Sequence, residues 1–199
     1  KPTIRGLTLR STNLVIKDNL TINRNARFVA ENLTFGGTMP DGKTNVITLI
    51  EDAVDFGAAN LVGVKNFVNE SNSIFQGADE ATFGFDDPGK GFDSIINRGT
   101  ISATAPYFKA VNFQNSGMII ANNPGSIKIQ ADSADLSGGS CLSEGSVEIS
   151  GGDVIAVNST ITAGTSGPLG ESGFGKLLIN VTNRLTDFGP GANNVWQVN

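Results

Sequence analysis

Three aspartates around a turn are the residues of this chain best suited to binding a metal ion. Asp86, Asp87 and Asp93 bracket a glycine-containing loop, and hard cations such as Ca²⁺ prefer several oxygen ligands. Their spacing matches neither the EF-hand loop nor the glycine-rich nonapeptide calcium repeat. Asp86-Asp87-Pro88-Gly89 also has the composition of a solvated turn, which we favour over a calcium site.

Acid-base and nucleophilic chemistry has few candidate residues. The chain contains no histidine, which removes Ser-His and Cys-His nucleophile arrangements. Its one cysteine, Cys141, excludes an intrachain disulfide and a cysteine-clustered zinc site. Asp132 with Asp135, and Glu51 with Asp52, are close only in sequence, whereas glycoside hydrolysis requires two carboxylates at a set separation across a cleft. We therefore predict that the protein is not an enzyme and uses no cofactor.

Aromatic sugar platforms and nucleotide cradles are the next alternatives. Trp196 and Tyr107 are the only residues of their types, and the 12 phenylalanines are better suited to a core. We expect Trp196 to cap the end of the fold or to contact a neighbouring subunit. The segment from Gly164 to Gly175 lacks the Lys-Ser/Thr of a phosphate loop, so we interpret it as an excursion from the main body.

Five Asn-x-Ser/Thr sequons are compatible with an exposed extracellular surface. They begin at Asn19, Asn32, Asn69, Asn158 and Asn180. Several are expected by chance in a chain this rich in Asn, Ser and Thr, so they indicate nothing further.

The charge of the chain argues against polyanionic partners. The formal net charge is −5, and the 14 Lys and Arg residues are scattered singly. We therefore expect neither a nucleic acid nor an anionic lipid as a partner. No apolar run approaches the roughly 18 residues of a membrane helix, which predicts no membrane insertion. Because the chain opens on Lys1, we expect either a removed leader or a piece of a longer protein.

The elements that must position these residues are short strands. Helical periodicity is absent over any useful length, whereas short β-type runs bounded by Gly, Asn, Asp, Ser or Pro recur throughout. The predicted strands are Leu14 to Ile16, Leu20 to Ile22, Arg27 to Ala30, Val46 to Ile50, Leu61 to Val64, Ser94 to Ile96, Phe108 to Phe113, Met118 to Ile120, Ile127 to Gln130, Val147 to Ile149, Val154 to Val157, Thr160 to Thr162 and Leu177 to Val181. The fold class is therefore predicted to be all-β.

Internal repeats refine that prediction. The segment from Gly125 to Ile129 (GSIKI) matches the segment from Gly145 to Ile149 (GSVEI) after 20 residues, and Asn97 to Ile101 (NRGTI) matches Asn115 to Ile119 (NSGMI) after 18. A weaker match links Asn66-Phe67-Val68-Asn69 to Asn112-Phe113-Gln114-Asn115, and Asn-Leu recurs at Asn13, Asn19 and Asn32. A period of this length predicts a chain that returns to the same position once per coil and stacks each coil on the one before.

Stacking of this kind, a parallel β-helix or β-solenoid, makes specific predictions about side chains. Ile127, Ile129, Val147 and Ile149 should point inward as an apolar ladder, with Lys128 and Glu148 outside, one above the other. Asn97 should lie over Asn115 at a corner. A β-sandwich or barrel also shows short strands at regular intervals and remains the alternative.

Three segments of the repeat region resemble the coils of a known class of proteins. They are Ile95 to Ile101 (IINRGTI), Phe113 to Ile119 (FQNSGMI) and Ser126 to Gly139 (SIKIQADSADLSGG). They resemble filamentous-haemagglutinin-like exoproteins and autotransporter passengers, which are bacterial surface or secreted proteins. The resemblance implies a single-stranded right-handed parallel β-helix with loop excursions, located outside the cell or on its surface. We expect one domain over residues 1–199, with a less regular, capping and decorated part (1–94), regular coils (95–165), and a loop excursion with a C-terminal coil (166–199).

The expected function is a non-enzymatic structural or adhesive module, such as a filament or surface-stalk subunit that assembles head to tail. Its expected partners are a second copy joined end to end or neighbouring segments of a larger exoprotein, with a glycan or a host surface receptor as a further candidate. The alternative is a glycan-binding or polysaccharide-cleaving β-helix. Pectin hydrolases of that fold combine Asn-x-Asp, Gly-His-Gly and Arg-x-Lys motifs, and this chain lacks both histidine and Arg-x-Lys.

Overall fold

The computed structural model describes residues 3–4, 6–22, 25–38, 42–50, 55–56, 60–77, 82–84, 92–122, 125–164, 175–186 and 195–198. Within these ranges the protein contains strands and turns but no helix, and every strand pair is parallel. The all-β prediction is confirmed. Antiparallel sandwiches, which were the alternative, do not fit the parallel pairing.

The strands form three sheets. One has nine strands in the order β1 (Thr3–Ile4), β4 (Leu20–Ile22), β7 (Asn45–Leu49), β11 (Ser73–Gly77), β14 (Thr100–Ala103), β16 (Met118–Ala121), β18 (Ser140–Ser143), β20 (Thr160–Ala163) and β22 (Val195–Val198). A ten-stranded sheet contains β21 (Leu177–Thr186), β19 (Val147–Ile155), β17 (Ile127–Asp135), β15 (Ala105–Asn115), β13 (Phe92–Asn97), β10 (Asn66–Asn69), β6 (Asn32–Phe35) and β3 (Asn13–Ile16), with β12 (Thr82–Gly84) paired to β15 and β8 (Asp55–Phe56) paired to β12. The third sheet contains β2 (Thr8–Arg10), β5 (Arg27–Val29) and β9 (Leu61–Val62).

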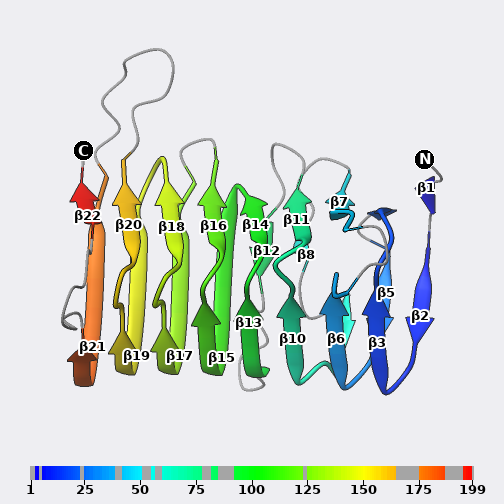
Figure 1. Ribbon diagram of the computed structural model, residues 1–199, viewed down its shortest axis with the longest axis horizontal. Helices are drawn as coiled ribbons and strands as arrows, with labels where there is room; N and C mark the ends of the chain where they lie inside the picture. The colour runs from blue at the N-terminus through cyan, green and yellow to red at the C-terminus, as the bar shows by residue number, and fades with distance from the viewer. Residues whose placement is uncertain are drawn as a thin grey trace, which may run out of the picture.

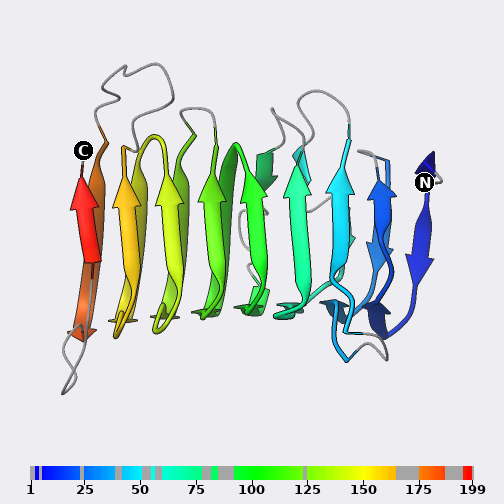
Figure 2. The same ribbon diagram turned by 45° about the horizontal axis from the view of Figure 1, so that its top comes forward.

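Consecutive strands belong to different sheets along most of the chain, so the chain passes repeatedly from sheet to sheet. We call the stretch from one strand of the nine-stranded sheet to the next a coil. Successive coils lie side by side along the long axis, with the N-terminus at one end and the C-terminus at the other (Figure 1). The turned view shows the same progression from end to end (Figure 2). This arrangement is consistent with a parallel β-helix.

The strand register follows the sequence repeats. Ile127 pairs with Val147, Lys128 with Glu148 and Ile129 with Ile149, as the 20-residue match predicts. The apolar members of these pairs are buried, whereas Lys128 is exposed and Glu148 half-buried. The predicted apolar ladder and outer charged pair are therefore confirmed.

Glycines make the corners between coils possible. In the NRG and NSG repeats, a Cβ at Gly99 or Gly117 would collide with backbone oxygen atoms of the preceding coil. Gly139 is restricted in the same way by the Asn115 carbonyl. Close approach of stacked backbones, more than turn conformation, therefore requires glycine at these three corners.

The interior changes character along the axis. In the aromatic coils, residues 27–77, Phe35 contacts Phe28, Phe67 and Phe75, with ring centroids 5.9, 5.3 and 5.4 Å apart. In the aliphatic coils, residues 118–163, the buried apolar side chains are Ile, Val, Leu, Ala and Cys141. The expectation that phenylalanines fill the core is confirmed for those whose burial is described.

Several predicted strand boundaries are wrong. Val147 to Ile149 and Val154 to Val157 were predicted as separate strands, but β19 runs through both until Ile155 and shifts its register with β21 between Gly151 and Asp153. The predicted strand from Phe108 to Phe113 is longer, because β15 begins at Ala105 and ends at Asn115. Short strands such as β11 and β18 were not predicted. Strand β18, with the sequence SCLS, contains no β-branched or aromatic residue and depends on the strands on either side.

Candidate functional site

The proposed calcium ligands are only partly described. Asp86 and Asp87 lie outside the described residues, and Asp93 is exposed on β13. Within the described ranges, no group of three His, Cys, Asp or Glu side chains is placed to hold a metal ion. The metal prediction for these three aspartates therefore stays a prediction.

The carboxylate pairs do not form a recognisable acid-base site. Asp135 accepts a hydrogen bond from the Ser137 backbone N–H at 3.0 Å, which is a turn contact. Asp132 is exposed on the outer face of the same strand, β17. Glu51 and Asp52 lie outside the described residues.

Cys141 is a core residue. It lies on β18 between Ile119 and Ile161, in register with both, and is buried. Burial raises the pKa of the Cys141 thiol to about 12, so the reactive thiolate is scarce at neutral pH. Cys141 is therefore a packed thiol of the core.

A buried row of asparagines, the inner asparagine ladder, stabilises one corner of the stack. Asn69 Nδ2 donates to Asn97 Oδ1 at 2.8 Å, and Asn97 Nδ2 donates to Asn115 Oδ1 at 2.7 Å. The same amide groups also donate to the backbone oxygens of Thr100 and Met118. Asn69 Oδ1 is the one described buried side-chain oxygen or nitrogen without a partner. The other amide groups are paired within the stack, which indicates a structural role, and the predicted stacking of Asn97 on Asn115 is confirmed.

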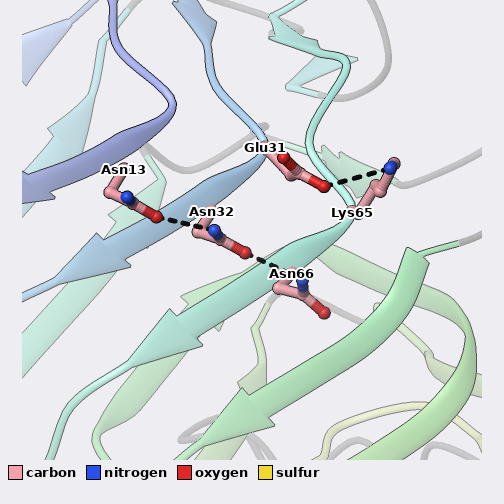
Figure 3. Close-up of polar contacts among 5 residues, drawn as sticks. All are labelled: Asn13, Glu31, Asn32, Lys65 and Asn66. Atoms are coloured by element: carbon pink, nitrogen blue, oxygen red, sulfur yellow. Dashed lines mark hydrogen bonds and ion pairs between the residues drawn. The ribbon is translucent and has the colours of Figure 1, made fainter.

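A second row, the outer asparagine ladder, lies on the ten-stranded sheet near the N-terminal end. Asn66 Nδ2 donates to Asn32 Oδ1 at 2.8 Å, and Asn32 Nδ2 donates to Asn13 Oδ1 at 2.7 Å (Figure 3). Beside it, Lys65 forms an ion pair with Glu31 at 3.0 Å (Figure 3). The hydrogen bond and Coulomb attraction to Glu31 raise the pKa of Lys65. The outer ladder joins coils across the surface and leaves little free polar capacity for a ligand.

The sequons lie in unlike environments. Asn69 is buried in the inner ladder and cannot accept a glycan in the folded protein. Asn19 is exposed, although its Oδ1 accepts a hydrogen bond from the Val46 backbone N–H. Asn158, at a positive φ of 54°, and Asn180 are both exposed. Sequence alone could not separate these classes, because each depends on which way the side chain points from its coil.

Trp196 is half-buried at the C-terminal end of the nine-stranded sheet. It pairs in register with Ile161 and packs against the core, while its Nε1 donates to Ser159 Oγ at 3.3 Å. It thus covers the previous coil, in agreement with the predicted cap. Of the proposed glycine-rich excursion, only Gly164 and Gly175 are described.

Both ends of the stack carry half-covered apolar side chains. The partly buried hydrophobic residues that pack against the core are Leu7, Leu9, Leu14, Ile16 and Leu20 at the N-terminal end, and Leu177, Ile179, Val181 and Trp196 at the C-terminal end. Among the described strands, none pairs with the outer edges of β2 and β3 or of β21 and β22. Within the described residues, nothing therefore covers the apolar interior or pairs with the strand edges at either end.

A polar groove crosses the outer face of β15, β17, β19 and β21. It has a volume of about 310 Å³, and its polar side chains are Lys109, Gln130, Asp132, Ser150, Asn180 and Thr182. Four of them form one row, since Lys109 pairs in register with Gln130, Gln130 with Ser150, and Ser150 with Asn180. Sequence reasoning missed this groove, although the 20-residue repeat already aligns Gln130 with Ser150.

Comparison with known proteins adds no relative: no family model, no curated protein and no solved structure matches this chain. Within the described ranges, no helix has the length and apolar character needed to span a membrane. The functional assignment therefore rests on the geometry of the end strands, the ladders and the groove.

Proposed function

We propose that the protein is a non-enzymatic structural module, a single-stranded right-handed parallel β-helix that acts as a stiff spacer or filament subunit outside the cell or on its surface. Right-handedness agrees with the strong preference of parallel strand connections for that hand. Parallel ladders that continue along the whole axis support the mechanical role, because each coil is hydrogen-bonded to its neighbours.

The observation that carries this proposal is the position of the half-covered apolar side chains. Among the described residues, those that pack on the core lie at the two ends of the stack, next to strand edges that no described strand pairs. Open strand edges and apolar surface favour pairing with a strand of another molecule. When the N-terminal end of one copy contacts the C-terminal end of the next, the contact can repeat without closing a ring and gives a filament. The ends thus suit a further coil of the same architecture, supplied by a second copy or by a neighbouring segment of a longer protein.

A charge placed inside the terminal coil tests the end contact. Leu14 on β3 packs against the core, whereas its neighbour Val15 points outward and is 49% exposed. Lysine at an inward position of an edge strand blocks pairing with another chain. Leu14→Lys should abolish concentration-dependent assembly in sedimentation velocity, and the matched control Val15→Lys should assemble like the parent protein.

A second variant, at the other end of the stack, tests the same contact from its other side. Ile179→Lys changes a half-covered residue of β21 and should block the same contact from the C-terminal side. Urea unfolding of each variant checks that the chain still folds. Assembly that both inward lysines leave intact would refute the end-to-end contact, as would a parent protein that stays monomeric at every concentration.

The source of the adjoining coil is decided by the intact mass of native material. A mass equal to that of this chain, with assembly in solution, makes a second copy the partner. A much larger covalent mass makes the partner a neighbouring segment of the same chain.

A further inference from the structure

We propose that the polar groove on the ten-stranded sheet binds a neutral oligosaccharide chain, laid along the stack axis across β15, β17, β19 and β21. The groove is hollow because small residues line its floor, namely Ala110, Ala131, Gly151 and Gly152. A Cβ at Gly152 would lie 2.8 Å from the Asp132 carbonyl oxygen, so close packing of the strands requires glycine there. The hollow therefore results from the close approach of neighbouring backbones, which requires small residues at this place.

The groove lies where the regular pattern of the long strands is interrupted. Along β17, the alternation of buried and exposed side chains slips by one residue, since Asp132 and Ser133 are successive positions that are not buried. In β19 the pairing with β21 shifts its register between Gly151 and Asp153. Both irregularities are next to the small residues Ala131, Gly151 and Gly152 that line the groove.

Unused hydrogen-bonding groups at the surface distinguish this groove from the asparagine ladders. The amides of the inner ladder bond to one another, and its one buried atom without a partner is Asn69 Oδ1. In the groove, the side chains of Lys109, Asp132 and Asn180 have no partner among the described residues. Gln130 Oε1 accepts a hydrogen bond from the Tyr107 hydroxyl at 3.0 Å, so donors and acceptors of the lining are both available to a ligand.

The lining selects a class of ligand. One cation, Lys109, and one anion, Asp132, leave the groove without the positive charge that a polyuronate or a nucleic acid would require. The lining contains no large apolar side chain to serve as an anchor for a protein partner. Amides, hydroxyls and a floor of small apolar residues match the hydroxyl groups and C–H faces of a neutral sugar.

The repeat of the groove favours a chain over a single small molecule. The row Lys109, Gln130, Ser150 and Asn180 presents one polar side chain per strand, and parallel strands lie about 4.8 Å apart. Equivalent polar groups therefore recur at a spacing close to the length of one hexose unit. This inference is independent of the end-to-end contact, because the groove lies on the side of the stack.

The test measures binding of cellohexaose, xylohexaose, mannohexaose and hexagalacturonate to the whole chain by titration calorimetry. Asn180 begins a sequon, so the protein is produced in a host that does not glycosylate asparagine. At least one neutral hexasaccharide should bind, with an affinity that added salt does not weaken. Gln130→Ala combined with Asn180→Ala should weaken that binding about tenfold or more, as expected for the loss of two or more hydrogen bonds.

The control is Gln114→Ala, an exposed residue of the same face of β15 outside the groove lining, and it should bind like the parent. Urea unfolding checks that the double variant is folded. The proposal is overturned if no neutral hexasaccharide binds, if only hexagalacturonate binds and salt abolishes that binding, or if the double variant binds as tightly as the parent.

Discussion

The aromatic coils have strands in all three sheets, whereas the strands of the aliphatic coils belong only to the nine- and ten-stranded sheets. Paired asparagines of neighbouring coils are 34 residues apart in the aromatic coils and 28 apart where Asn69 meets Asn97, whereas Ser126 and Ser146 of the aliphatic coils are 20 apart. Phenylalanine rings fill the interior of the first region, and small aliphatic side chains fill that of the second. The parallel strand register is kept in both regions, despite the longer connections of the first and the different packing of the second. The backbone hydrogen-bond ladders therefore determine how the coils stack.

The comparison also separates two kinds of asparagine. The inner ladder is buried and joins Asn69 in the aromatic coils, through Asn97, to Asn115, which ends β15 just before the aliphatic coils. The outer ladder lies at the surface and joins only N-terminal coils. The inner ladder therefore stabilises the junction of the two regions. The outer ladder links surface strands that core packing already stabilises.

The largest expected effect is at the centre of the aromatic coils. Phe35 is fully buried against three other rings, so Phe35→Ala should lower the free energy of unfolding by about 3 to 5 kcal/mol. Urea denaturation measures the change, with Thr34→Ala, the outward neighbour, as the control. A loss no greater than that of the control would mean that the rings do not pack as described.

The inner asparagine ladder should come next. Asn97→Ala removes the donor to Asn115 Oδ1 and the acceptor of Asn69 Nδ2 inside the core, which should cost about 2 to 3 kcal/mol. Asn66→Ala, in the outer ladder, should cost about 0.5 to 1 kcal/mol. Equal losses in urea denaturation would contradict the distinction between the two ladders.

A smaller effect concerns Cys141 in the aliphatic coils and depends on pH. Burial raises the folded pKa of the Cys141 thiol to about 12, above its ordinary value of 9.0. Between these values the unfolded chain loses the thiol proton while the folded chain keeps it, so this group's contribution is full below about pH 9 and is lost as pH rises towards 12. Cys141→Ala should show a shallower loss of stability over that range. Identical dependence of stability on pH in the two proteins would exclude a buried Cys141 thiol with a raised pKa.

The smallest effect is expected at the Lys65 and Glu31 ion pair. Both side chains are largely exposed, and exposed pairs contribute little because solvent and salt screen them. Lys65→Ala should leave the urea midpoint unchanged within error, at low and at high salt. A clear drop would show that this pair takes part in joining the aromatic coils.

Much of the fold could be predicted where coils are equal in length. The GSIKI and GSVEI repeat predicted the pairing of Ile127 with Val147, and the NRG and NSG repeat predicted the asparagine stack. In the aromatic coils, connections of unequal length hide the period, although Asn66 to Asn69 and Asn112 to Asn115 occupy the same sheet positions two strands apart. The pairing there depends on three-dimensional contacts.

The elements that could not be predicted depend on neighbouring strands whose positions cannot be read from the sequence. Strand β18, with the sequence SCLS, has weak intrinsic β-propensity and is held between β16 and β20. The polar groove lies at the slipped alternation of β17 at Asp132 and at the register shift after Gly151, and neither has a local signature in the sequence. The metal prediction at Asp86 and Asp87 lies outside the described residues.

Diffraction from aligned, concentrated native protein tests the central claim of stacked coils that continue end to end. The account predicts filaments in the electron microscope and a reflection near 4.8 Å along the filament axis. Because amyloid gives the same spacing, Cys141 in these filaments should stay unreactive towards a thiol reagent and the filaments should dissociate on dilution. Compact particles without the axial reflection, or filaments that form only after Cys141 becomes reactive, would contradict the account.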